Sequence, residues 1–212
     1  MTKLILTRHG HVDGISPERF RGRMELPLTD QGLAEAGRTA AFIASTWTPA
    51  AIYSSPMQRC LATAEAISRA CGGTGVVVLE GLNDLDYGAW QWRTHEEAAG
   101  TDPVLYGLWK SAPQLVRFPG GESLQDLLAR TADALRETLA HHPADTVVLV
   151  GHDSVNRALL LQLLDQPLSA YWRFALDPCG VSELDIDGGQ VSARRINEIG
   201  HLRGPPSRRQ VP

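Results

Sequence analysis

Leu4-Ile5-Leu6-Thr7-Arg8-His9-Gly10 is the stretch of this 212-residue sequence that decides the fold. Its apolar run predicts a strand that ends at an arginine, a histidine and a glycine. Open α/β sheets bind ligands at the carboxyl ends of their strands. Arginine can bind two phosphate oxygens at once, an imidazole can attack phosphorus, and glycine lets the backbone approach a ligand closely. The stretch therefore predicts a phosphate site, and the alternative is a surface arginine beside a histidine in a turn.

Composition limits the classes to which the protein can belong. With 212 residues, 43% of them apolar, the chain can bury one full core, and we expect a single domain over residues 1–202. The net charge of −4 speaks against nucleic acid or a membrane surface as partner, because both require a basic field. Three unevenly spaced cysteines and no segment of membrane-span length indicate a cytoplasmic protein. Residues 203–212 are expected to form a mobile tail.

Strands and helices are predicted to alternate along the chain. Helices are expected from Thr29 or Asp30 to about Trp47, and from Ser55, as cap, to about Ala70. Such alternation indicates a three-layer α/β fold with a mostly parallel central sheet and helices on both faces. Residues 80–123 are irregular apart from a short helix near 94–99, and long segments of this kind commonly form lids or binding loops. The predicted strands cover residues 3–7, 51–54, 76–79 and 146–150.

Three of these strands end in chemically active side chains. Arg8 and His9 follow the first strand, Arg59 follows the second, and His152 follows the fourth. Because the carboxyl ends of parallel strands meet at one edge of a sheet, we expect the four side chains to converge. Arg59 lies in the first turn of its helix, where the helix dipole disfavours a cation, which suggests a nearby anion. The alternative for Arg59 is an exposed helix arginine.

Further motifs extend this pattern over most of the chain. They are Arg8-His9-Gly10, Arg19-Phe20-Arg21-Gly22, Pro27-Leu28-Thr29, Ser54-Ser55-Pro56 with Arg59, Leu82-Asn83-Asp84 with Tyr87-Gly88, Gly120-Gly121-Glu122-Ser123, and Gly151-His152. Together they resemble the histidine phosphatase superfamily, which has the phosphoglycerate-mutase-like fold. Within it, the chain resembles branch 1 phosphatases of the alpha-ribazole and broad-specificity kinds.

The resemblance implies a phosphomonoester hydrolase that acts on a small phosphorylated metabolite without cofactor or metal. His9 would form a phosphohistidine, while Arg8, Arg59 and His152 neutralise the phosphoryl oxygens. The cationic neighbours favour a neutral His9, whereas a bound phosphate favours a protonated His152. The expected partner is the small-molecule substrate, and a homodimer is left open.

Two carboxylic acids are candidates for the proton donor to the leaving alkoxide. Asp84 occupies the position where this branch usually has a glutamate, so its side chain is one methylene shorter. Asp153 is the rival, because another branch uses the acid of a His-Asp pair. We favour Asp84 from its loop context, since a helix cap is a sufficient explanation of Asp153. The alternative for Asp84 is a turn residue that caps its own backbone.

The substrate stays open on the sequence alone. Arg21 and Gly22 are tentative substrate-binding residues, although an exposed arginine is an adequate alternative for Arg21. Ile15 stands where a substrate-binding asparagine is often found. An apolar set is expected either to cover the site as a lid or to pack on the core; it consists of Leu105, Trp109, Leu115 and Phe118.

Two other activities compete with hydrolysis. A phosphoglycerate mutase must protect its phosphohistidine from water, and the loop over 80–123 lacks a long charged insertion that would enclose it. A metal-dependent hydrolase is suggested by the spacing of His9, His11 and Asp13, which resembles a zinc site. The charge of Arg8 and the lack of a second ligand cluster weigh against a metal.

Overall fold

A computed structural model describes residues 1–203 of the chain; most of the expected tail, residues 204–212, lies outside them. The described residues contain a six-stranded sheet with the strand order β3-β2-β4-β1-β5-β6. β1 to β4 run parallel, and β5 and β6 are antiparallel to their neighbours. The strands are β1 (Thr2–Arg8), β2 (Ala51–Ser54), β3 (Val77–Val78), β4 (Thr146–Gly151), β5 (Val181–Asp187) and β6 (Gln190–Glu198).

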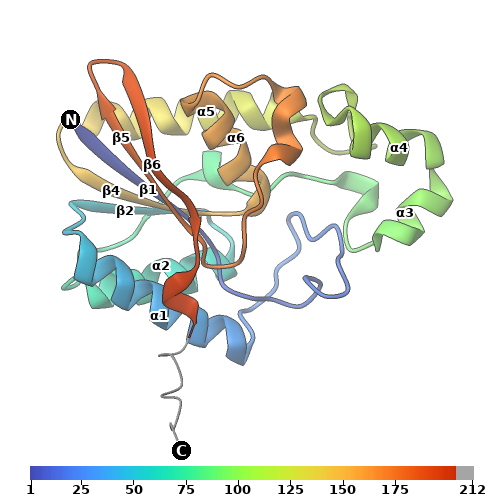
Figure 1. Ribbon diagram of the computed structural model, residues 1–212. Coiled ribbons are helices and arrows are strands. Elements are labelled where there is room, and N and C mark those ends of the chain that lie inside the picture. The colour runs from blue at the N-terminus through green and yellow to red at the C-terminus, as the bar shows by residue number, and fades with distance from the viewer. Residues whose placement is uncertain (204–212) are drawn as a thin grey trace, which may run out of the picture.

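Helices cover both faces of this sheet, as Figure 1 shows. α1 and α2 lie on one face, α5 and α6 on the other, and α3 and α4 extend beyond the carboxyl ends of the parallel strands. The α-helices are α1 (Asp30–Thr46), α2 (Gln58–Ala70), α3 (His95–Thr101), α4 (Pro103–Ser111), α5 (Leu124–His141) and α6 (Asp153–Leu163). Short 3-10 helices lie at Glu80–Leu82, Gly88–Trp90, Pro113–Leu115, Leu168–Arg173 and Gly200–Leu202.

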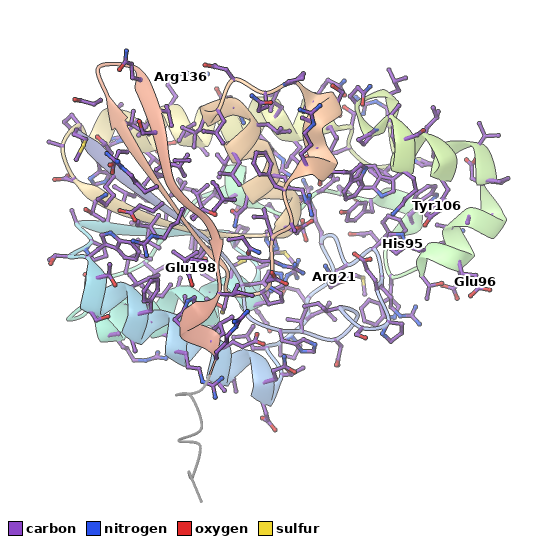
Figure 2. All side chains as sticks on the ribbon, viewed as in Figure 1. Arg21, His95, Glu96, Tyr106, Arg136 and Glu198 are labelled. Carbon is purple, nitrogen blue, oxygen red and sulfur yellow. The ribbon has the colours of Figure 1, made fainter. Side chains whose placement is uncertain are left out.

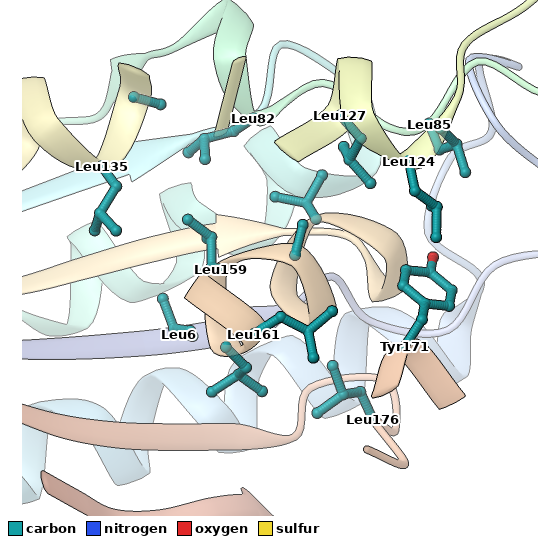
Figure 3. Close-up of a cluster of buried hydrophobic side chains, with 14 of the residues drawn as sticks. Leu6, Leu82, Leu85, Leu124, Leu127, Leu135, Leu159, Leu161, Tyr171 and Leu176 are labelled. Atoms are coloured by element: carbon teal, nitrogen blue, oxygen red, sulfur yellow. The ribbon is translucent and has the colours of Figure 1, made fainter. Parts of the chain in front are cut away.

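The apolar run of β1 is explained by these two helical layers. Leu4 and Leu6 pack with the side chains of α5 and α6, while Ile5 packs on the opposite face with those of α1 and α2. Figure 3 shows Leu6 among Leu159 and Leu161 of α6. A strand covered on both faces has apolar residues at every position, and this removes the alternation typical of a half-exposed strand.

The fold confirms the predicted α/β class, and it adds detail that the sequence-based predictions did not give. β3 is only two residues long, and Val77 and Val78 are exposed. α2 begins at Gln58 rather than after Ser55, whose hydroxyl is used elsewhere. The β5–β6 hairpin was not predicted. The four apolar residues expected either to form a lid or to pack on the core mostly pack on the core. Trp109 and Phe118 are buried and Leu105 packs against their cluster, but Leu115 is exposed.

The short helix expected near 94–99 is present as α3. Its start is fixed by a capping box, in which the Thr94 hydroxyl accepts from the Glu97 backbone N–H and the Glu97 carboxylate accepts from the Thr94 N–H. Within residues 1–203, no helix is both long enough and apolar enough to cross a membrane.

Candidate active site

Arg8, His9, Arg59 and His152 lie together at the carboxyl ends of the parallel strands. β1 and β4 are neighbours with Arg8 opposite Gly151, so the residues that follow them are adjacent in space. The ring centroids of His9 and His152 are 5.3 Å apart, and Arg59 Nε donates to His152 Nδ1 over 3.3 Å. All four side chains are buried. The cluster therefore concentrates two imidazoles and two guanidinium groups in one water-poor site.

His9 is held with one particular nitrogen available for chemistry. Its Nδ1 is 2.7 Å from the Gly10 carbonyl oxygen, so Nδ1 carries the proton and donates it, which leaves the Nε2 lone pair free. Burial, and after it the charge of Arg59, hold the pKa of His9 well below its ordinary value of 6.5. His9 is thus an unprotonated imidazole in the pH range where most enzymes work.

Gly10 has a packing role that differs from the expected approach to a ligand. A Cβ on Gly10 would lie 2.5 Å from the carbonyl oxygen of Gly32 in α1. The Gly10 backbone N–H donates to the Thr63 hydroxyl. Glycine at this position lets the loop that carries His9 lie directly against α1, which fixes the orientation of the imidazole.

Arg59 is fully buried, and every part of its guanidinium has an acceptor. Nη1 donates to the Met24 carbonyl at 2.7 Å, and Nη2 donates to the Gly22 carbonyl at 2.7 Å and to Asp84 Oδ2 at 3.0 Å. An anion near this helix start was expected, and the Asp84 carboxylate is one. These contacts fix the guanidinium in place beside His152.

Arg8 is anchored at one end and unpaired at the other. Its Nη1 donates to the Leu176 carbonyl at 2.7 Å, whereas its buried Nε has no hydrogen-bond partner among the described residues. The backbone N–H of Cys179 donates to the carbonyls of Arg8 and His9. Because buried N–H groups are nearly always paired, the unpaired Nε points to an external acceptor such as a phosphate oxygen.

His152 contacts two side chains that sequence reasoning did not connect with it. Its Nδ1 accepts from Arg59, so its Nε2–H donates to the Ser55 hydroxyl over 2.8 Å; Cys60 Sγ lies 3.4 Å from the same nitrogen. Burial, and after it the charge of Arg59, hold the pKa of His152 well below 6.5. The Ser55 hydroxyl, which was expected to cap α2, instead holds the His152 imidazole.

The two candidate acids differ in what they contact. Asp84 is buried; its Oδ1 accepts from the Ser154 hydroxyl at 2.5 Å and from the Leu85 N–H at 2.9 Å, and its Oδ2 accepts from Arg59. Asp153 is the first residue of α6 and forms an ion pair with Arg157 at 2.8 Å, with no cap on its own helix. The alternative explanation of Asp153 as a helix cap is therefore wrong.

A cavity opens from His9 past both acids toward α3 and α4. Arg21 lines it and is mostly buried; its Nη1 donates to the Gly14 carbonyl, and burial lowers its pKa. Gly22 also lines it, with its carbonyl occupied by Arg59. Figure 2 labels Arg21 and His95, which lie along this path. The remaining walls are Glu18, Arg19, Phe20, Tyr87, Trp109, Ser154 and Trp172.

The pattern of residues matches a known family. The family model of the histidine phosphatase superfamily (branch 1) matches residues 4–199 of this chain. The chain belongs to this superfamily. The match confirms the resemblance that the motifs indicated, and it extends over both the parallel strands and the unpredicted β5–β6 hairpin.

Several relatives of this histidine phosphatase are known. A bifunctional protein of Mycobacterium tuberculosis is 34% identical over 203 residues, which are 95% of this chain but 55% of that protein, so the chain spans about half the length of such relatives. Phosphoserine phosphatase 1 of Hydrogenobacter thermophilus is 30% identical over 202 residues, 95% of each chain. The solved structure of Bacillus stearothermophilus YhfR has a TM-score of 0.87 at 29% identity, covering 96% of this chain and 100% of that one.

The zinc-like spacing does not form a metal site in this histidine phosphatase. His9 and His11 line different cavities, and His11 Nδ1 lies 2.9 Å from the Thr29 hydroxyl. Asp13 is exposed. In residues 1–203, no three His, Cys, Asp or Glu side chains are arranged to hold a metal ion. The geometry gives the metal-dependent alternative no support.

Proposed function

We propose that this protein hydrolyses small phosphomonoesters through a phosphohistidine at His9. The observation that carries the proposal is the free Nε2 of a neutral, buried His9 beside Arg8, Arg59 and His152. The Nε2 lone pair forms a bond to phosphorus while the bond from phosphorus to the leaving oxygen breaks, and an acid protonates that oxygen. Water then attacks the phosphohistidine, its proton returns to the acid, and inorganic phosphate leaves a neutral His9.

The cations supply the charge stabilisation that phosphoryl transfer requires. The unpaired Arg8 Nε is available to donate to an equatorial oxygen, and Arg59, whose donors are already paired, contributes its fixed positive charge. A phosphate dianion brought beside His152 raises the affinity of this imidazole for a proton, because an opposite charge favours the charged form. One site can therefore keep His9 neutral while substrate binding protonates His152.

We further propose Asp84 as the proton donor. Its carboxylate contacts Arg59 and lies 3.4 Å from His152 Nδ1, so it touches the groups that would hold the phosphate. Asp153 is instead paired with Arg157. Asp84→Asn should slow the hydrolysis of alkyl phosphates by at least about 100-fold but largely spare aryl phosphates, whose leaving group needs little protonation. The same pattern in Asp153→Asn, with Asp84→Asn unaffected, would reverse the assignment.

Trapping the covalent intermediate tests the proposed function directly. Wild type mixed with ³²P-labelled substrate and quenched without acid should carry an acid-labile, base-stable label on His9, and His9→Gln should carry none and lose turnover. Because relatives include phosphoserine phosphatases, phosphoserine heads the panel of monoesters, and Arg21 is proposed to contact the substrate. Label on a serine or aspartate, or full activity of His9→Gln, would refute the mechanism.

We also propose a cytoplasmic protein with a single domain over residues 1–202 and no nucleic-acid partner. The support is the net charge of −4 and the absence of disulfides among its cysteines in the described residues. Cell fractionation tests the location, limited proteolysis tests the domain, and light scattering measures whether the protein forms a homodimer.

A further inference from the structure

Arg130 of α5 donates to the backbone of the loop that carries Asp84 and to the Glu122 carboxylate. All five of its N–H groups donate: Nη1 to the carbonyls of Gly81 at 3.0 Å and Asn83 at 2.6 Å, and Nη2 to the Asp84 carbonyl at 2.9 Å. The remaining two, on Nε and Nη2, donate to Glu122, each over 2.9 Å. The planar guanidinium thereby fixes the carbonyls of Gly81, Asn83 and Asp84. The backbone after Leu82 has no regular secondary structure of its own to hold it in place.

Glu122 completes the same connection from the other side. Its Oε2 accepts from the Asp86 backbone N–H at 3.0 Å, and its Oε1 accepts from Arg23 Nη2 at 3.0 Å. Arg23 in turn directs its Nε toward the Asp84 carbonyl at 3.3 Å. Glu122 therefore joins the Asp84 loop both to α5 and to residues 22–24, whose carbonyls hold Arg59.

The glycines that precede Glu122 explain how the two loops come so close. A Cβ on Gly121 would lie 2.4 Å from the Asp86 carbonyl oxygen, and one on Gly88 would lie 2.2 Å from the Pro119 carbonyl oxygen. The backbones of residues 86–88 and 119–121 are thus in direct contact, and two backbone hydrogen bonds join the segments: the Glu122 N–H donates to the Asp86 carbonyl, and the Ala89 N–H donates to the Pro119 carbonyl. The Gly120-Gly121-Glu122 motif brings a carboxylate to the Asp84 loop.

We propose that Arg130 and Glu122 are positioning residues for the proton donor, an inference that rests on the proposed function. A carboxyl on a side chain one methylene shorter than glutamate depends more on where its backbone lies. Misplacement by about 1 Å can cost on the order of 100-fold in rate. Arg130 and Glu122 hold the carbonyl of Asp84 and the peptide of Asp86, so they set the reach of the Asp84 carboxyl without touching substrate.

The experiment compares two leaving groups in matched variants. Arg130→Met should lower kcat/KM for phosphoserine on the order of 100-fold and that for 4-nitrophenyl phosphate by no more than about threefold, because the aryl leaving group needs little protonation. Arg136→Met is the control, since Arg136 lies on the same helix and makes an exposed ion pair with Asp133 (Figure 2). It should leave both values unchanged.

A merely structural role predicts a different result. If Arg130→Met lowers both values equally, the positioning role is wrong. Asp84→Asn combined with Arg130→Met should be no slower on phosphoserine than Asp84→Asn alone, because both changes remove the same contribution; additive losses would also refute the proposal.

Two further variants keep the test informative if Arg130→Met does not fold. Arg130→Lys retains the charge but loses the planar set of donors, and Glu122→Gln retains the shape but loses the charge; both should show the same selective loss on phosphoserine, and equal losses on both substrates would overturn the proposal. Labelling of His9 by 4-nitrophenyl phosphate, measured in the same variants, reports the proposed function separately, because it depends on the nucleophile and not on the acid.

Discussion

Lowering the pH from 7.5 to 5.5 should destabilise the fold through its two buried active-site imidazoles. His9 and His152 both have a pKa well below the ordinary value of 6.5 in the folded protein. The folded state therefore binds fewer protons than the unfolded chain as the pH falls through 6.5. Stability contributed by such a group is complete above that pH and decreases below it, until the folded group itself titrates.

When both folded imidazoles stay neutral at pH 5.5, the magnitude is set by their titration in the unfolded chain. Between pH 7.5 and 5.5, protonation of an unfolded-state imidazole with a pKa of 6.5 shifts the folding equilibrium about tenfold toward the unfolded chain. This shift corresponds to about 1.4 kcal/mol. Two such groups give about 2.7 kcal/mol of lost stability. His201, whose burial also lowers its pKa, adds to this loss. Carboxylates with lowered pKa values, such as Glu122, lose stability only below their ordinary value of 4.5 and so do not contribute in this window.

Urea unfolding at both pH values measures the effect. The free energy of unfolding of wild type should fall by at least about 2.7 kcal/mol, and His9→Asn and His152→Asn should each reduce this change by about 1.4 kcal/mol. His141→Asn, which replaces an exposed histidine of α5, controls for the loss of an imidazole. Equal stability of wild type at pH 7.5 and 5.5 would show that the imidazoles are not held neutral. So would an undiminished change in a variant that carries both His9→Asn and His152→Asn.

Two further predictions concern the reaction. Dialysis against EDTA should leave kcat/KM unchanged, because Arg8, Arg59 and His152 take the place of a metal in neutralising the phosphate; loss of activity that zinc restores would contradict this. In a mixture of 3-phosphoglycerate and a trace of 2,3-bisphosphoglycerate, the formation of 2-phosphoglycerate should be far slower than phosphate release from the best monoester of the panel. Efficient isomerisation with negligible phosphate release would indicate a mutase.

The positions of site residues that directly follow an apolar strand could be predicted from the sequence. Arg8, His9 and His152 are each next to a run that two helical layers cover, so the position of the strand also locates the side chain. The meeting of these residues follows from the parallel order alone. The resemblance to the family added Asp84, which no periodicity would have selected from an irregular loop.

The β5–β6 hairpin was missed, and the burial of its charges could not be predicted from the sequence. Glu183 and Asp185 of β5 are buried and both pair with Lys3 of β1, at 2.5 and 2.6 Å. Residues 183–187 alternate between carboxylates and Leu184 or Ile186, a period of two that is typical of a strand, but that pattern predicts exposed carboxylates. Only the pairing with Lys3 across strands makes their burial tolerable. The Arg130 contacts were hidden for a similar reason, since they join segments about 46 to 49 residues apart.

The position of β1 between β4 and β5 has a consequence for folding during synthesis. β1 is hydrogen-bonded to β4 on one side and to β5 on the other. Translation proceeds from the N-terminal toward the C-terminal end, so β1, which carries Arg8, is made before residues 146–151 and 181–187, the strands with which its two edges pair. The Leu176 carbonyl that anchors Arg8 emerges in the same late portion. His9 is therefore synthesised before β4, the Leu176 carbonyl and β5, all of which are needed to complete the cluster around it.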